Sequence, residues 1–315
     1  MTDRPTVLVP HLVMARGTEP MAEAIRDRLD DVDLRVATDE ETTLEHAPDA
    51  EVVVTHRLSD ELLDAATELR WVHSLTAGLD HLDLDRLEER GLILTNSSGI
   101  HAQPIGEHVL GALLHFERGF ARAVAQQHRR EWDRFGATEL ADRTVAVVGV
   151  GAIGTRVVAL CDAVGAETIG VKRDPTTAPD ALADCVTPDR LHDALERADC
   201  AVLACPLTDE TRGMVDADAL DALGEGVLVN VARGEIVDDD ALVEALDDGA
   251  LRGAALDVFT EEPLPEDSPL WGFENVLLTP HVAGTTPHYW ERAADQFAEN
   301  YRRYVAGEAL ENRRL

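Results

Sequence analysis

Lysine is almost absent from this sequence: Lys172 is the only lysine among 315 residues, and arginine supplies every other basic side chain apart from histidine. Acidic residues outnumber basic ones by 61 to 28, which gives a net charge of −33. Such a surface repels phosphate groups, so the charge argues against binding to nucleic acid or to an anionic membrane. Two environments fit this charge, an ordinary cytoplasm and a cytoplasm of molar salt. We favour the second, because the acids are spread along the whole chain and lysine is avoided.

Long apolar runs and paired cysteines are also missing. No uninterrupted apolar stretch approaches the ~20 residues that a membrane span needs. The four cysteines form no CxxC pair, so we expect reduced thiols rather than a disulfide framework. We predict no metal site, because the histidines within residues 101–115 are seven positions apart rather than three or four. The first residues show no leader pattern, and we expect a cytoplasmic protein.

The length favours two domains, and the pattern of apolar segments favours the α/β class. Helix-like segments alternate with short apolar runs at 6–10, 51–55, 71–75 and 92–95. A helical stretch at about 102–128 leads to a second series of strands, which opens at 144–150. These runs lack strict alternation, as is typical of parallel strands covered on both faces. We therefore predict two doubly wound parallel-sheet lobes, with a last helix after His281 that packs on the first lobe.

The stretch GVGAIG places glycines at 149, 151 and 154, directly after a strand and at the start of a helix. In this spacing the first glycine permits a tight turn, the second lets the backbone approach a pyrophosphate, and the third lets the helix pack closely on its strand. The helix N-terminus offers N–H groups to the anion. The motif therefore predicts dinucleotide binding, with an ordinary glycine turn as the alternative.

The second strand of this lobe, ETIGV, ends at Lys172, where domains that bind NAD commonly carry an acid for the ribose. A count of ~20 residues from the last glycine reaches Asp174 instead, which would indicate NAD. We give more weight to the strand end, because the selecting side chain must leave the edge of the sheet. Lys172 and Arg173 then predict contacts to the 2′-phosphate of NADP(H), with a solvated basic pair as the alternative.

Three further strands deliver Arg233, Glu262 and His281 to the same edge of the predicted sheet. An arginine can bind a carboxylate at two points and polarise a neighbouring carbonyl group. A histidine can donate a proton to a carbonyl oxygen, and a carboxylate can hold the imidazole in orientation. Each residue alone has a structural explanation, but the three together beside a dinucleotide predict a catalytic site.

With these residues in place, the chain resembles the D-isomer-specific 2-hydroxyacid dehydrogenase family. The matching stretches are GVGAIG, CPLTDETRGMVD, LVNVARGEIVDDDAL, ALDVFTEEPLPEDSPLW and NVLLTPHVAG, and the match is strong from about 75 to 285. The resemblance implies a Rossmann-type dinucleotide-binding domain at 99–285, inserted in a flavodoxin-like substrate domain at 1–98 and 286–315. Lys172 departs from the acid usual in the family and resembles its NADP-preferring members, and NSSGIHAQPIGEH matches the hinge region only loosely.

The resemblance also implies roles for individual residues. Arg233 would bind the substrate, His281 would be the acid/base, and Glu262 would orient it. Backbone N–H groups around Thr76 would hold the substrate carboxylate, and Asp257 would face the nicotinamide amide. The implied substrate contacts are Leu75, Thr76, Ala77, Gly78, Arg233 and His281. The implied cofactor contacts are Gly149, Gly151, Ala152, Ile153, Gly154, Lys172, Arg173, Cys205, Pro206, Thr211, Val231, Ala232, Asp257, His281 and Gly284.

The function that these features favour is the reversible reduction of a 2-oxo acid to a D-2-hydroxy acid by NADPH, with NADH as a weaker cofactor. A formate dehydrogenase is disfavoured, because that group carries glutamine where this chain has Glu262. A dinucleotide-sensing protein similar to the corepressors of the family is the alternative. The resemblance further implies a homodimer, formed through the helix after Gly99. The substrate stays open, since its side-chain pocket would come from PHLVMAR (10–16), THRL (55–58) and the region of Tyr289 and Trp290.

The charge of −33 predicts that folding depends on salt. Repulsion between acids is long-ranged in dilute buffer, whereas the Debye length is only about 3 Å at 1 M salt. We expect unfolding to accelerate as salt is diluted from molar to millimolar concentration, measured by far-UV circular dichroism. Sucrose of equal osmolality serves as the uncharged control. A fold that persists in dilute buffer would contradict the interpretation as a salt-adapted protein.

Overall fold

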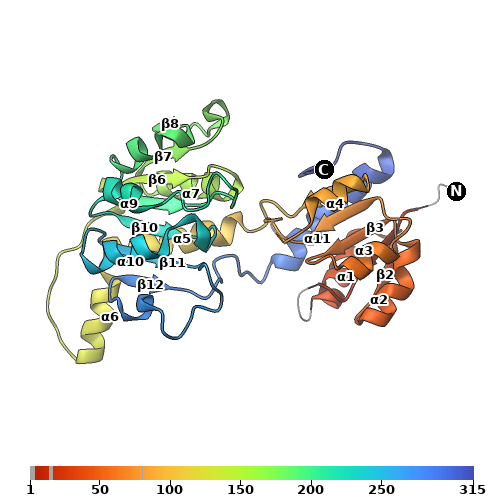
Figure 1. Ribbon diagram of the computed structural model, residues 1–315, viewed down its shortest axis with the longest axis horizontal. Helices are drawn as coiled ribbons and strands as arrows, with labels where there is room; N and C mark the ends of the chain where they lie inside the picture. Colours follow the sequence, from red (N-terminus) through yellow and green to blue (C-terminus); the bar gives the residue numbers. More distant parts are fainter. Residues whose placement is uncertain (1–3, 14–16, 80) are drawn as a thin grey trace. The chain divides into compact units, whose positions relative to one another are not determined.

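The computed structural model of this chain describes residues 4–13, 17–79 and 81–315 (Figure 1). The chain divides into two compact units. The first contains the residues up to His101 together with Thr286–Leu315, and the second contains Ala102–Thr285. Within the described ranges, no helix is both long and apolar enough to cross a membrane.

The first unit is built on a five-stranded parallel sheet with the strand order β2-β1-β3-β4-β5, the doubly wound order that was predicted. Its strands are β1 (Thr6–Val9), β2 (Asp33–Val36), β3 (Val52–Thr55), β4 (Trp71–Ser74) and β5 (Ile93–Asn96). Its helices are α1 (Thr18–Arg26), α2 (Glu40–His46), α3 (Asp60–Ala65), α4 (Leu84–Glu89) and α11 (Tyr289–Ala306), with a 3-10 turn at Ala47–Asp49. The last helix, α11, packs against α1 and the sheet, where Phe297 stacks on Trp71.

The second unit is built on a seven-stranded parallel sheet with the order β12-β11-β10-β9-β6-β7-β8. Its strands are β6 (Thr144–Val148), β7 (Glu167–Val171), β8 (Asp184–Val186), β9 (Cys200–Leu203), β10 (Val227–Asn230), β11 (Gly253–Leu256) and β12 (Val276–Leu278). Its α-helices are α5 (Ala102–Glu117), α6 (Phe120–Arg129), α7 (Ala152–Ala163), α8 (Leu191–Leu195), α9 (Ala217–Leu223) and α10 (Asp239–Asp247). Short 3-10 turns lie at Leu140–Asp142, Pro175–Thr177, Pro188–Arg190, Gly234–Ile236 and Pro269–Gly272. The order is that of a Rossmann-type domain, as predicted.

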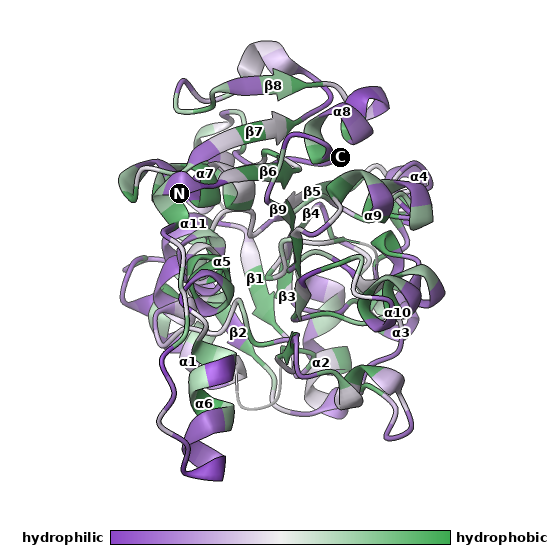
Figure 2. Ribbon diagram, turned by 90° about the vertical axis from the view of Figure 1, so that its left-hand side faces the viewer, coloured by the Kyte–Doolittle hydropathy of each residue, from purple (hydrophilic) through white to green (hydrophobic). Residues whose placement is uncertain are grey.

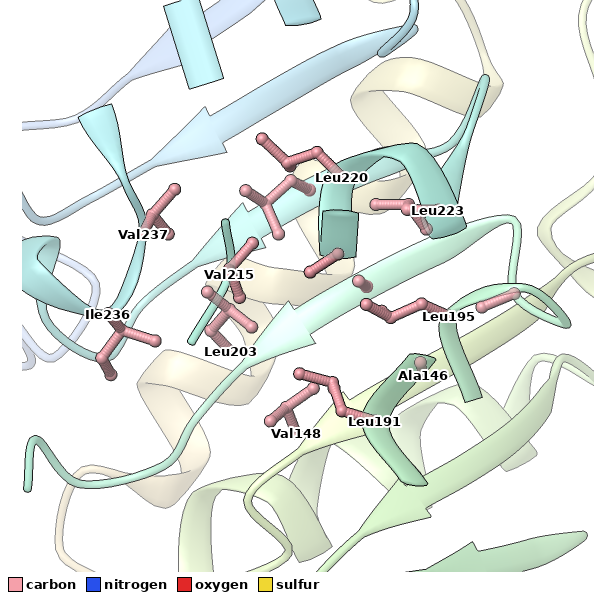
Figure 3. Close-up of a cluster of buried hydrophobic side chains, with 14 of the residues drawn as sticks. Ala146, Val148, Leu191, Leu195, Leu203, Val215, Leu220, Leu223, Ile236 and Val237 are labelled. Atoms are coloured by element: carbon pink, nitrogen blue, oxygen red, sulfur yellow. The ribbon is translucent and has the colours of Figure 1, made fainter. Parts of the chain in front are cut away.

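Helices cover both faces of the seven-stranded sheet, and this explains why its strands read as continuous apolar runs. Val145 and Val147 of β6 face a cluster with α5 and α7. Ala146 and Val148 of the same strand face the cluster formed with α8, α9 and α10, part of which Figure 3 shows. Because neighbouring residues point to opposite faces, every position of the strand needs an apolar side chain. Figure 2 shows the difference in hydropathy between a buried strand and a surface helix: β3 of the first unit is green, whereas α6 is part green and part purple.

Two strands, β2 and β8, were missed in the sequence, and both lie at the edge of their sheets. The sequence of β2 is DLRV, with alternating exposed and half-buried side chains. The sequence of β8 is DCV, in which only the valine is buried. Each of these two edge strands has one neighbour and less cover, and its mixed sequence carries no continuous apolar signal. Pairing with β1 and β7, rather than composition, makes these segments strands.

The predicted helical stretch at 102–128 is found as two helices, α5 and α6, which are separated at Gly119. Gly119 has a φ of +64°, a left-handed backbone that ends α5 and starts α6 in a new direction. A Cβ atom at this position would lie 2.7 Å from the ring of Phe135, so any other residue would have to displace that ring. This interruption left no sign in the sequence, because the residues on both sides have a helical pattern.

A buried carboxylate ties the amino ends of several strands together. Glu117, at the end of α5, is only 1% exposed. It pairs with Arg143, which precedes β6, and with Arg252, which precedes β11. Burial acts to raise the pKa of this carboxyl, but the hydrogen bonds from Arg252, Thr138 and Arg143 outweigh it and lower the pKa. The carboxylate therefore stays ionised and fixes the sheet edge opposite the predicted site.

Candidate active site

The carboxyl ends of the parallel strands in the second unit carry almost all of the predicted site residues. Gly149 follows β6, Lys172 follows β7 and Cys205 follows β9. Arg233 follows β10 and Asp257 follows β11. Because all seven strands are parallel, these segments leave the sheet at one edge, where ligands of open α/β sheets bind.

The three glycines of GVGAIG meet three different constraints. Gly149 has a φ of +94°, and a Cβ atom there would lie 2.5 Å from the backbone nitrogen of Cys205. A Cβ atom on Gly154 would lie 2.1 Å from the carbonyl oxygen of Gly149, so α7 packs directly on the turn. Gly151 is different, because a Cβ atom there would meet nothing within 4 Å. The first and third glycines are therefore needed by the protein itself, whereas the space at the second is open for a ligand.

The N-terminus of α7 lies at this open space. Gly151 is its N-cap residue and provides no side chain, and the first α-helical bond runs from Thr155 N to Gly151 O. The N–H groups of Ala152, Ile153 and Gly154 precede that bond and have no carbonyl partner within the helix. Such a helix end attracts an anion. These residues therefore fit the pyrophosphate of a dinucleotide.

Lys172, the only lysine, lies against the glycine-rich turn. Its Nζ atom donates to the carbonyl oxygen of Val150 over 2.9 Å and to that of Thr177 over 3.2 Å. An ammonium group has three N–H bonds, so one is left for a ligand at the end of β7. Arg173 is exposed and pairs with Glu210 at 3.1 Å.

Asp174, the competing candidate for a ribose contact, is already used by its own turn. Its carboxylate accepts hydrogen bonds from the hydroxyl and the backbone N–H of Thr176, and these lower its pKa. The carboxylate caps the 3-10 turn Pro175–Thr177. The strand end is thus occupied by the cations of Lys172 and Arg173, while Asp174 serves the loop.

His281 and Glu262 form the pair that the sequence predicted. Nδ1 of His281 lies 2.8 Å from Oε2 of Glu262, and Oε1 of Glu262 accepts from the N–H of Phe259. The carboxylate therefore holds the imidazole with its proton on Nδ1 and leaves Nε2 to act on a ligand. His281 has a φ of +51°, a left-handed conformation that few residues other than glycine adopt. Its side chain is about half exposed, at 51%.

Asp257 explains how this unusual backbone is held. Its carboxylate is 2% exposed and accepts from the N–H groups of Val282 and Ala283 and from the hydroxyl of Thr279. The backbone N–H of His281 donates to the carbonyl oxygen of Asp257. The sequence analysis assigned Asp257 only a contact to the nicotinamide amide, which stays a prediction. Its role in fixing the loop around His281, which continues to Gly284, was missed.

Asn230 and Gly234, which the sequence analysis also missed, position Arg233. Asn230, buried at the end of β10, accepts from the N–H of Ala232 and donates to the carbonyl oxygen of Arg233. A Cβ atom on Gly234 would lie 2.0 Å from the backbone of Phe259, so the loop after β10 packs directly on the loop that carries Glu262. The only sign of these two residues in the sequence was that they lie close to Arg233 in its motif.

The remaining cofactor candidates line the same edge of the sheet. Thr211 closes the loop after Cys205 by donating from its hydroxyl to the carbonyl oxygen of Pro206. Val231 and Ala232 are nearly buried in the turn before Arg233. Among the residues that the structure describes, no three His, Cys, Asp or Glu side chains gather as a set of metal ligands.

The candidate carboxylate loop, Leu75–Gly78, belongs to the first unit and follows β4. All four of its carbonyl oxygens accept hydrogen bonds, from Tyr289 Oη, Ser97 N, Asn96 Nδ2 and Thr76 Oγ1 in chain order. In contrast, the described residues offer no hydrogen-bond partner to the N–H groups of Ala77 and Gly78. A loop with occupied carbonyl groups and unused N–H groups is suited to an anion. The other pocket segment, PHLVMAR, lies partly outside the described residues, which omit 14–16.

The glycine geometry predicts opposite results for two alanine substitutions. Gly151→Ala places its methyl group in open space, so we expect an unchanged melting temperature. Dinucleotide affinity, measured by calorimetry, should fall at least about 10-fold, because the methyl group blocks close approach to the pyrophosphate. Gly154→Ala is the matched comparison and should lower the melting temperature, because its methyl group has no space. Equal affinity of Gly151→Ala and wild type would contradict the assignment.

Comparisons with known proteins agree with this geometry. The family described as D-isomer specific 2-hydroxyacid dehydrogenase, NAD binding domain, matches residues 110–283. A D-3-phosphoglycerate dehydrogenase of Methanocaldococcus jannaschii is 33% identical over 307 residues, covering 94% of this chain and 58% of that protein. A glyoxylate/hydroxypyruvate reductase of Arabidopsis thaliana is 34% identical over 255 residues, 79% of this chain and 80% of that protein.

A solved structure shows the same likeness along the full chain. The D-isomer specific 2-hydroxyacid dehydrogenase from Xanthobacter autotrophicus, in complex with NADPH and MES, matches with a TM-score of 0.87 and 26% identity. The match covers 99% of this chain and 98% of that one. The phosphoglycerate dehydrogenases are longer, and this chain spans only 52% to 58% of their length. The family match over residues 110–283 and the relative that is 33% identical across 94% of this chain show that this chain belongs to the D-isomer-specific 2-hydroxyacid dehydrogenase family.

Proposed function

We propose that this chain catalyses the reversible reduction of a 2-oxo acid to a D-2-hydroxy acid by a nicotinamide cofactor. The observation that carries the proposal is the 2.8 Å contact between His281 Nδ1 and Glu262 Oε2, at the sheet edge that also carries the dinucleotide turn. A proton donor held in one orientation beside a hydride source is what carbonyl reduction requires. Membership of the family supports the same reaction class.

A nicotinamide cofactor held at the glycine-rich turn would supply a hydride to the carbonyl carbon of the substrate. Doubly protonated His281 donates the proton on Nε2 to the carbonyl oxygen and becomes neutral, while Nδ1 keeps its proton and continues to donate to Glu262. Arg233 binds the substrate carboxylate and polarises the carbonyl group. The N–H groups of Ala77 and Gly78 provide further donors for the carboxylate. In the reverse direction, neutral His281 accepts the hydroxyl proton at Nε2.

Removal of the acid/base should separate turnover from cofactor binding. We expect His281→Gln to lower kcat by roughly 10² to 10⁴, the range for a positioned acid/base. Cofactor affinity, measured by calorimetry, should change little. The matched control is His288→Gln, because His288 is also an exposed histidine beside a glutamate, Glu291 at 3.2 Å. Near-normal turnover by His281→Gln would remove His281 from the mechanism.

A panel of 2-oxo acids, including glyoxylate, pyruvate and a branched acid, tests the reaction itself. Oxidation of NADPH or NADH is followed at molar salt. Cofactor binding without turnover of any acid in the panel would instead support a dinucleotide-sensing protein. The homodimer implied by the resemblance stays a prediction.

We further propose that NADPH is preferred over NADH. Lys172 supports this, because its ammonium group is fixed at the end of β7 and keeps one N–H bond for the 2′-phosphate. Arg173 can exchange its exposed partner Glu210 for the phosphate. Two similar solved structures are described with NADPH or NADP, although a D-lactate dehydrogenase from Aquifex aeolicus is described with NAD. A hydrogen bond to a charged group contributes about 1.5 to 3 kcal/mol, equivalent to about 10- to 150-fold in affinity.

Substitution of Lys172 should shift cofactor preference and also weaken both cofactors. Lys172→Ala removes the phosphate contact and the two bonds to carbonyl groups, so KM should rise for NADH and considerably more for NADPH. Lys172→Asp should shift the kcat/KM ratio further towards NADH, by repelling the phosphate and accepting from the ribose. Arg190→Ala, at an exposed ion pair with Asp193, is the control. A wild-type preference for NADH, or a ratio unmoved by either variant, would contradict the proposal.

A further inference from the structure

The hydroxyl group of Tyr289 connects two parts of the first unit that are far apart in the sequence. Tyr289 is the first residue of α11, and its hydroxyl donates to the carbonyl oxygen of Leu75 over 2.5 Å. The same oxygen lies 2.7 Å from Nε2 of His56, which follows β3. The three residues form a chain of hydrogen bonds that ends on the loop Leu75–Gly78.

The direction of the protons in this chain follows from the contacts. Tyr289 gives its only proton to Leu75, so its oxygen must accept from His56. His56 therefore carries a proton on Nε2. Burial, with smaller effects from His81 and His101, lowers the pKa of His56 to about 4, so the ring is neutral near neutral pH. Burial also raises the pKa of Tyr289, which keeps the phenol protonated.

Packing holds both rings in place. The ring of Tyr289 stacks on His56 and on His101, with centroids 5.8 and 5.4 Å apart. Trp290 meets His56 and Tyr289 edge to face. The carbonyl oxygen of His56 accepts from Nε2 of His81 over 2.8 Å, which fixes the backbone at the start of the chain of hydrogen bonds.

The last hydrogen bond of this series affects the N–H groups of the loop Leu75–Gly78. The carbonyl group of Leu75 and the N–H group of Thr76 belong to the same peptide unit, so a strong hydrogen bond to the oxygen polarises the N–H. Among the described residues, the only acceptor for that N–H is Ser74 Oγ, at a long 3.4 Å. Leu75 is also the one loop carbonyl that depends on a side chain from outside the segments around β4 and β5.

We propose that His56 and Tyr289 are positioning residues for the substrate carboxylate, which act by holding and polarising the peptide unit between Leu75 and Thr76. The proposal rests on the proposed function, because it takes the loop Leu75–Gly78 as the carboxylate site. Neither side chain reacts with the substrate. Their contribution is to keep the N–H groups of the loop directed at the anion.

The chain offers a closely matched pair of substitutions for the test. Tyr289→Phe removes the hydroxyl and keeps the stacked ring. Tyr301→Phe removes another nearly buried tyrosine hydroxyl from the same helix, and among the described residues that hydroxyl has no hydrogen-bond partner. Binding of oxamate, an unreactive analogue of a 2-oxo acid, is measured by calorimetry, and KM and kcat are measured with the best acid of the panel.

We expect Tyr289→Phe to raise the oxamate Kd and the KM for the 2-oxo acid about 3- to 10-fold, the effect of one lost hydrogen bond. The KM for NADPH and kcat should stay within about 2-fold of wild type, since general destabilisation would alter all constants together. Tyr301→Phe should match wild type in every constant. An unchanged oxamate Kd in Tyr289→Phe would overturn the proposal.

His56 provides an independent arm with a conservative rescue. His56→Leu removes the donor to Tyr289 and should weaken oxamate binding to a similar extent. His56→Gln presents an amide N–H near the position of Nε2 and should restore binding. An equal loss of oxamate affinity in both variants would show that only packing matters, and it would overturn the proposed role of the hydrogen bond from His56 to Tyr289.

The calorimetric readout separates this inference from the reaction. A wild-type protein that binds oxamate but reduces no 2-oxo acid would contradict the proposed function, and weaker oxamate binding by Tyr289→Phe would still support the positioning role. A wild-type protein that reduces 2-oxo acids, with a Tyr289→Phe variant of unchanged KM, would leave the function standing and overturn the inference.

Discussion

The parallel direction of all seven strands in the second unit is the constraint on which the site depends. Each strand ends at the same edge, so residues from Gly149 to His281 are brought to one edge of the sheet although they are far apart in the sequence. Helices on both faces make this possible, because they bury both sides of every central strand. The opposite edge is fixed by the buried carboxylate of Glu117 and its two arginines.

At the functional edge, buried polar side chains convert strand ends into defined turns. Asp257 accepts three hydrogen bonds and holds the left-handed backbone of His281. Asn230 does the same for the turn at Arg233. Both side chains are nearly inaccessible to water, where an unpaired polar group is costly, so the turns have one stable arrangement. The side chains of His281 and Glu262 can remain partly exposed because the groups that hold their loops are buried.

The apolar pattern predicted the central strands well, because strands covered on both faces must be apolar at every position. It failed at β2 and β8, which lie at sheet edges and have mixed sequences. It also gave no sign of the interruption at Gly119, because a helical pattern continues on both sides of this left-handed residue. In the site, the motif residues were predicted, whereas Asn230, Gly234 and the loop-holding role of Asp257 were not. Their importance depends on which backbone groups fold back against them.

The sequence by itself determined the α/β class and the dinucleotide turn, and it predicted the trio of Arg233, Glu262 and His281, because each rests on local spacing after a strand. Tertiary structure alone decided what the single lysine holds, namely the carbonyl groups of Val150 and Thr177. It also joined His56 to Tyr289, 233 positions apart, and Tyr289 to Leu75, 214 positions apart. Local spacing is written in the chain, but contacts across such separations exist only after helix α11 packs on the sheet of the first unit.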